Sequence, residues 1–109
     1  MSSDSSFDLY QVAASSTAIY PQETGLAYLC AGLCGEAGEL AGKISKQFRG
    51  DNKPISREDI KGELGGILCF LSELARRYGF SLHEVAEHNI EKLQSRKQRG
   101  VLMGNGDNR

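Results

Sequence analysis

The sequence has no tryptophan, two prolines and three cysteines among its 109 residues. Cys30, Cys34 and Cys69 form no C-x-x-C pair, and together with His83 and His88 they match no zinc-ligand spacing. A zinc site or a disulfide framework is therefore not expected. We expect instead three reduced cysteines packed in the core of a cytosolic protein.

Long apolar runs and an excess of charge of one sign are also missing. No apolar run approaches the ~20 residues that span a bilayer, and the opening "MSSDSSFDLY" has neither the basic nor the apolar region of a secretory signal. The 13 Lys and Arg residues nearly balance the 14 Asp and Glu residues, which gives no electrostatic case for nucleic-acid or membrane binding. The expected location is the cytoplasm.

The length and composition favour one small domain that needs a partner. Residues 1–109 fall within the usual size of a single domain, but 39% of apolar residues is modest and a chain this short buries a limited fraction of its surface. Residues 1–6 are expected to form a disordered polar tip, and residues 97–109 a glycine-rich tail. We expect oligomerisation to complete the core.

Apolar residues recur at helical spacing over most of the chain, with no alternating strand pattern. The pattern predicts a short helix over residues 7–15. It also predicts a long helix that begins near Gln22 and ends at the turn residues of "RGDNKP". Its apolar face consists of Leu26, Leu29, Leu33, Leu40, Ile44 and Phe48. The pattern predicts an all-α fold.

Capping residues mark two further helices. Ser56 is the expected N-cap of a helix that ends at Gly79, and Ser81 with Glu84 fits a capping box that opens a helix to about Arg96. The expected architecture is a helical bundle whose four-helix core is completed by homo-oligomerisation.

Three glutamates lie at the edges of two apolar stripes. Glu36 and Glu39 stand in "GLCGEAGELAGKISKQFRG", and Glu63 takes a comparable position on the next helix. If the stripes pack together, the three carboxylates converge, and they cannot all stay ionised without compensation. A hard divalent cation such as Mg²⁺ or Mn²⁺ supplies it. The alternative is a set of surface salt bridges to lysines, namely Lys43, Lys46 or Lys61.

The segments "GLCGEAGELAGKISKQFRG", "KGELGGILCFLSELARRYG" and "SLHEVAEHNIEKLQSRKQRG" together resemble the MazG family of all-α nucleoside triphosphate pyrophosphohydrolases. The family pattern is E-x-x-E, then E-x-x-D, then a helix bearing Asn and Lys. Glu36 and Glu39 form the first pair, Glu63 begins the second, and "NIEKLQSR" supplies the third element. The resemblance spans residues 17–109.

The resemblance implies hydrolysis of a (deoxy)nucleoside triphosphate to the monophosphate and pyrophosphate, by a homodimer or homotetramer that uses Mg²⁺ or Mn²⁺. The cation would neutralise triphosphate oxygens and lower the pKa of a water that attacks the α-phosphorus. The expected metal-binding and catalytic residues are Glu36, Glu39 and Glu63. The expected phosphate-binding residues are Asn89, Lys92 and Arg96, which share a helical face, and Lys46.

One position departs from the family pattern, because Gly66 stands where the family has aspartate. A water, Asp59 or Asp107 could complete the metal shell, or the site is weakened. A second hypothesis is therefore a nucleotide-binding or regulatory protein without catalysis, and a third is a purely structural helical oligomer. Ile19 and Tyr20 could line a base pocket, and the pattern does not identify the base.

Overall fold

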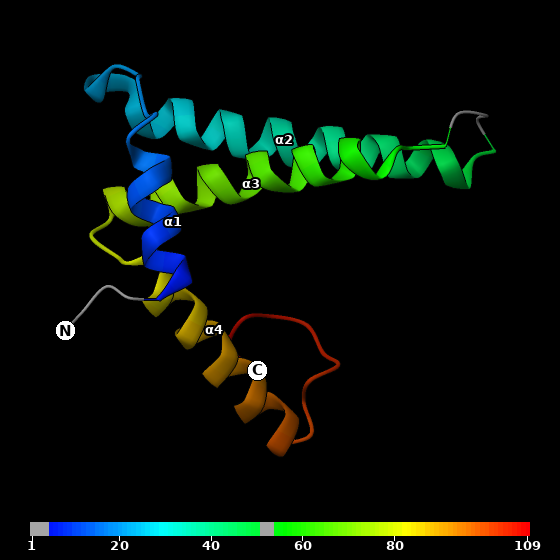
Figure 1. The fold of residues 1–109 in the computed structure, drawn as a ribbon. Coiled ribbons are helices and arrows are strands. Elements are labelled where there is room, and N and C mark those ends of the chain that lie inside the picture. Colours follow the sequence, from blue (N-terminus) through cyan, green and yellow to red (C-terminus); the bar gives the residue numbers. More distant parts are fainter. Residues whose placement is uncertain (1–4, 51–53) are drawn as a thin grey trace.

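The computed structural model describes residues 5–50 and 54–109, and these parts of the chain contain helices and no strand (Figure 1). The elements are α1 (Ser6–Ser15), the short 3-10 helix η1 (Gln22–Thr24), α2 (Gly25–Phe48), α3 (Arg57–Arg77) and α4 (Leu82–Gln98). The all-α prediction is confirmed.

Helices α2 and α3 form a long antiparallel hairpin (Figure 1). Helix α1 packs across α3 near the end where α2 begins, and α4 leaves the hairpin at an angle. Gly32 has no side chain, which lets α2 and α3 approach closely. The Phe70 ring occupies the space that a Cβ atom at Gly32 would need.

Serine side chains begin three helices. The Ser56 hydroxyl accepts a hydrogen bond from the Asp59 N–H, and Ser81 and Glu84 form the reciprocal capping box, so both predicted caps are confirmed. Ser5 caps α1 in the same way. That helix therefore begins inside the stretch that was expected to be a disordered tip, and residues 1–4 lie outside the described residues.

Glycines end α3 and α4. Gly79 has φ +80° and Gly100 has φ +75°, conformations that disfavour L side chains. Next to Gly79 the Phe80 N–H donates to the Ala75 carbonyl, and the glycine N–H donates to the Arg76 carbonyl. This paired arrangement satisfies carbonyls that have no partner within the helix.

A polar lock joins α1 to the start of α4. The Gln11 amide donates to the carbonyls of Ser72 and Phe80 and accepts a hydrogen bond from the Leu82 N–H. The Asp8 carboxylate accepts from the His83 N–H. Because the first N–H groups of a helix have no partner within it, these contacts fasten α4 to α1.

The core of a single chain is small. Leu29, Ala75 and Leu82 are the buried apolar residues of the described chain, whereas Phe48 is 87% exposed. The radius of gyration is 16.7 Å, against about 13 Å for a compact domain of this size. The accessible surface is 8039 Å², against roughly 6,000 Å² for a compact monomer of this mass.

The prediction of core cysteines is wrong for this chain. Cys30 and Cys34 are exposed, Cys69 is half-buried, and all three are free. Cys30 and Cys34 share the helical spacing of the apolar residues, but α3 covers only part of the surface of α2. In the described residues no helix is both long enough and apolar enough to cross a membrane.

Candidate metal and nucleotide site

Three carboxylates converge in the middle of the α2–α3 hairpin. Glu36 and Glu39 come from α2 and Glu63 from α3, and one oxygen from each lies within 4.8 Å of the other two. Glu36 and Glu63 are half-buried, and Glu39 is exposed. The helical periodicity of both helices predicts this meeting, because the two apolar stripes face each other.

Glu63 has the least favourable surroundings of the three. Its Oε2 atom is buried without a hydrogen-bond partner. Burial raises the pKa of Glu63, and so do the hydrogen bond to Glu39 and the charges of Glu39 and Glu36, against a smaller lowering effect of Lys43. A cation between the carboxylates would remove both problems, because it gives the buried oxygen a partner and offsets the like charges.

The salt-bridge alternative does not describe these glutamates. In residues 5–50 and 54–109 none of the three forms an ion pair with a lysine or an arginine, and Lys61 pairs with Glu58 at 3.4 Å. Lys43 acts on Glu63 through its charge alone. The donor set of three carboxylates therefore fits a hard divalent cation.

Gly66 faces this cluster. A Cβ atom built at Gly66 would lie 2.8 Å from Cδ and 2.9 Å from Oε2 of Glu36. The Glu36 carboxylate therefore rests against the α3 backbone in space that a side chain at position 66 would enter. The exposed Asp59 is not among the converging carboxylates.

Asp107 pairs with the cations of α4. Its Oδ1 atom accepts hydrogen bonds from Lys92 Nζ at 3.2 Å and Arg96 Nη2 at 3.3 Å, and its carbonyl accepts from the same arginine nitrogen at 2.7 Å. These hydrogen bonds hold the pKa of Asp107 below its usual range. The tail folds back along α4 (Figure 1). Within one chain, Asp107 therefore lies with α4 and is not among the three converging carboxylates.

The expected phosphate-binding residues do not meet the carboxylates within one chain. Asn89, Lys92 and Arg96 lie on α4, which contacts α1 and α3 but not α2 in the described residues. Arg96 is only 6% exposed, because the tail covers it. Lys46 lies exposed on the last turn of α2.

A cavity of about 130 Å³ lies where the end of α1, the segment before η1, α2 and α3 meet. It is lined by Ile19 and Tyr20, which the sequence offered as residues of a base pocket, and by Tyr28, Phe70 and Glu73. Sequence reasoning missed Glu73, although a carboxylate between the apolar residues of α3 is a signal of the same kind as Glu63.

Comparisons with known proteins identify the family of the chain. A family profile described as the MazG nucleotide pyrophosphohydrolase domain matches residues 24–101, which include α2, α3 and α4. The chain is 45% identical to the Gene 37 protein of Mycobacterium phage L5 over 111 residues, which cover 94% of this chain and 97% of that protein. No solved structure gives a significant match. The resemblance noted in the sequence is thus confirmed, and the chain belongs to the MazG nucleotide pyrophosphohydrolase family.

Proposed function

We propose that residues 1–109 form a single domain that hydrolyses a (deoxy)nucleoside triphosphate to the nucleoside monophosphate and pyrophosphate, and so controls or cleans the nucleotide pool of the cytoplasm. The observation that carries the proposal is the cluster of Glu36, Glu39 and Glu63, with its buried oxygen that lacks a partner. Membership of a family named for this reaction supports it.

Glu36, Glu39 and Glu63 are the residues that would hold Mg²⁺ or Mn²⁺. When bound, such a cation neutralises triphosphate oxygens and makes water a better nucleophile. A carboxylate of the cluster that stays free of the cation can accept the proton of the attacking water. Glu36 and Glu63 are half-buried, which limits their mobility and would hold their oxygens in place for the reaction.

Asn89, Lys92, Arg96 and Lys46 are the proposed phosphate ligands. Because α4 does not reach α2 within one chain, a second copy would bring Asn89, Lys92 and Arg96 to the carboxylates. The excess surface and exposed apolar side chains, such as Leu64 at 51%, favour such a homodimer or homotetramer. Light scattering at micromolar concentration tests this, and a monomeric mass would exclude it.

Gly66 supports a second candidate function, a nucleotide-binding or regulatory protein with weakened catalysis. The position faces Glu36 but brings no ligand, so the cluster has one carboxylate fewer than the family pattern. With fewer negative charges the cluster attracts a divalent ion less strongly. Triphosphate oxygens can supply the missing ligands, which makes metal binding dependent on nucleotide.

Release of pyrophosphate separates these functions. The purified full-length protein would be incubated with each common NTP and dNTP in Mg²⁺ or Mn²⁺, with chelated samples as controls. Metal-dependent release that is lost in Glu63→Gln supports the enzyme. Thermal stabilisation by nucleotide without release selects the regulatory protein. If neither pyrophosphate release nor thermal stabilisation is observed, a purely structural oligomer is the remaining hypothesis.

A further inference from the structure

The cavity beside α1 has an aromatic wall. Tyr20 and Tyr28 are stacked with ring centroids 5.3 Å apart, and the Phe70 ring is tilted against Tyr28 at 6.0 Å. Flat aromatic rings at the edge of a cavity suit a planar ligand, because every nucleobase has a π-face that stacks on them.

This cavity lies next to the carboxylate cluster along the hairpin. Phe70 rests on Gly32, which is one turn before Glu36, and Gly66 rests against Glu36 one turn before Phe70. One helical turn is about 5.4 Å. A nucleotide whose phosphates lie at the cluster would therefore reach the cavity with its sugar and base.

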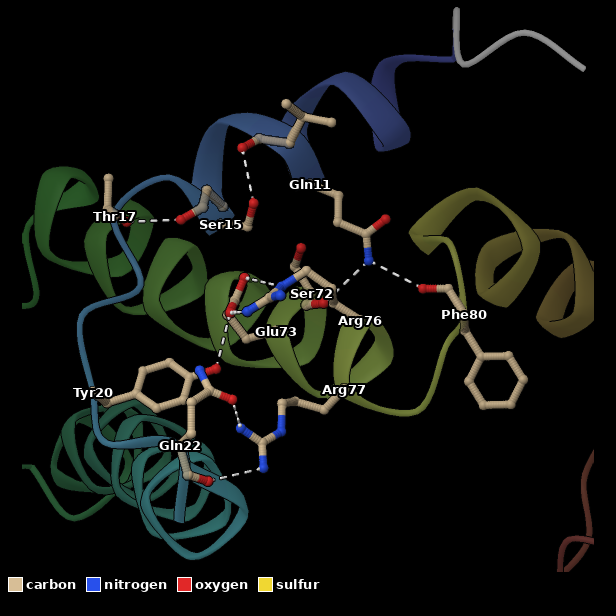
Figure 2. Close-up of polar contacts among 12 residues, drawn as sticks. Gln11, Ser15, Thr17, Tyr20, Gln22, Ser72, Glu73, Arg76, Arg77 and Phe80 are labelled. Atoms are coloured by element: carbon tan, nitrogen blue, oxygen red, sulfur yellow. Dashed lines mark hydrogen bonds and ion pairs between the residues drawn. The ribbon is translucent and has the colours of Figure 1, made fainter. Parts of the chain in front are cut away.

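Glu73 places a charged acceptor in the wall of the cavity. It is 3% exposed, and its Oε1 atom accepts hydrogen bonds from the Tyr20 hydroxyl at 3.0 Å and from Arg76 Nη2 at 2.7 Å (Figure 2). Its Oε2 atom accepts only a long hydrogen bond, 3.4 Å, from Arg76 Nε. Because an ionised carboxylate has about four acceptor sites, Oε2 can still accept from a ligand.

We propose that this cavity receives the base and that Glu73 selects bases that carry an amino group. Guanine, adenine and cytosine can donate from that group to Oε2, and guanine adds a neighbouring ring N–H. Uracil and thymine present carbonyl oxygens on both sides of their one N–H, and a carboxylate repels those oxygens. This inference rests on the proposed function, since it assigns the cavity to the same substrate.

Binding of non-hydrolysable nucleotides tests the inference without turnover. Calorimetry with the full-length protein and Mg²⁺ would compare α,β-imido analogues of dGTP, dATP, dCTP, dUTP and dTTP. We expect the analogues of dGTP, dATP and dCTP to bind at least about tenfold more tightly than those of dUTP and dTTP. The last two lack the amino group and so lose a hydrogen bond to a charged group.

Three variants make the test specific. Glu73→Gln keeps the shape of the side chain but adds an amide donor. The preference for amino-bearing bases over uracil and thymine should therefore shrink at least about fivefold. Tyr20→Phe keeps the ring and removes one of the two groups that hold Glu73. It should reduce the same preference by less than Glu73→Gln does. Glu58→Gln, an exposed glutamate on the same helix, should leave it unchanged.

The outcomes separate the two proposals. Equal affinity for all five bases, or a preference unchanged in Glu73→Gln with native circular dichroism, would overturn the selection by Glu73. If Glu73→Gln does not fold, an unchanged preference in Tyr20→Phe overturns it. Base preference without pyrophosphate release from the natural nucleotides refutes only the proposed catalysis. No binding of any analogue refutes both.

Discussion

Two glutamates on α3, Glu63 and Glu73, stand ten residues apart in opposite surroundings. Glu63 shares its site with two other carboxylates, has a buried oxygen without a partner, and has a raised pKa. Glu73 is more deeply buried, yet the Tyr20 hydroxyl and the Arg76 guanidinium both donate hydrogen bonds to its Oε1 atom (Figure 2).

The difference teaches that partners, rather than depth of burial, indicate what a buried carboxylate does. A buried glutamate that accepts hydrogen bonds from nearby donors is held in one position, and its charge is neutralised within the chain. A glutamate among like charges has a raised pKa, as Glu63 does, and is relieved by a proton or by a cation. The half of the hairpin near α1 therefore supplies its own electrostatic balance, and the half around Glu63 does not.

The largest expected effect comes from removing one charge of the cluster. Glu63→Gln or Glu36→Gln should lower the rate of pyrophosphate release at least about a thousandfold, because metal-assisted stabilisation contributes several kcal/mol. Helical circular dichroism should stay native, and Glu58→Gln should keep the normal rate. A wild-type rate in either cluster variant would show that the metal assignment is wrong.

Metal addition should separate the two glutamates by stability. Mn²⁺ or Mg²⁺ at a hundred times its dissociation constant should stabilise the wild-type fold by about 2.7 kcal/mol, more readily when nucleotide is present. Glu73→Gln should keep this response and Glu63→Gln should lose it. Thermal melts with and without chelator measure it, and an identical response in both variants would remove the distinction.

Without metal, we expect Glu73→Ala to destabilise the fold more than Glu63→Ala. Glu73→Ala should lower the free energy of unfolding by about 2 kcal/mol, because it leaves the Tyr20 hydroxyl without an acceptor and Arg76 without its ion pair. Glu63→Ala should cost less, since it removes a carboxylate from a repulsive cluster. Urea denaturation in chelator measures both, and a larger loss in Glu63→Ala would contradict the comparison.

The smallest effect concerns the missing family aspartate. Gly66→Asp should raise the affinity for Mn²⁺ without nucleotide about tenfold, because it adds a carboxylate beside Glu36, and should preserve or raise turnover. Gly65→Asp is the matched control, since a Cβ atom there meets no atom within 4 Å. Equal metal affinity of Gly66→Asp and wild type in calorimetry would mean that position 66 does not act on the metal.

Local features of the fold could be predicted from the sequence. The caps at Ser56 and Ser81 and the glycine end of α3 involve residues three to five apart, so composition and spacing suffice to predict them. The meeting of Glu36, Glu39 and Glu63 was also predictable. It needs only helical periodicity and the packing of two apolar stripes from neighbouring helices.

The sequence by itself determined the helices, the helix ends marked by Ser56, Gly79 and Ser81, and the carboxylate cluster. The tertiary structure decided the partners of Glu73, the lock between Gln11 and α4, the pairing of Asp107 with α4 and the exposure of the cysteines. Tyr20 and Glu73 are 53 residues apart, and Gln11 and Leu82 are 71 apart. Periodicity says which face of a helix is apolar, whereas the crossing of α1 over α3 and the direction of α4 determine which distant polar groups meet.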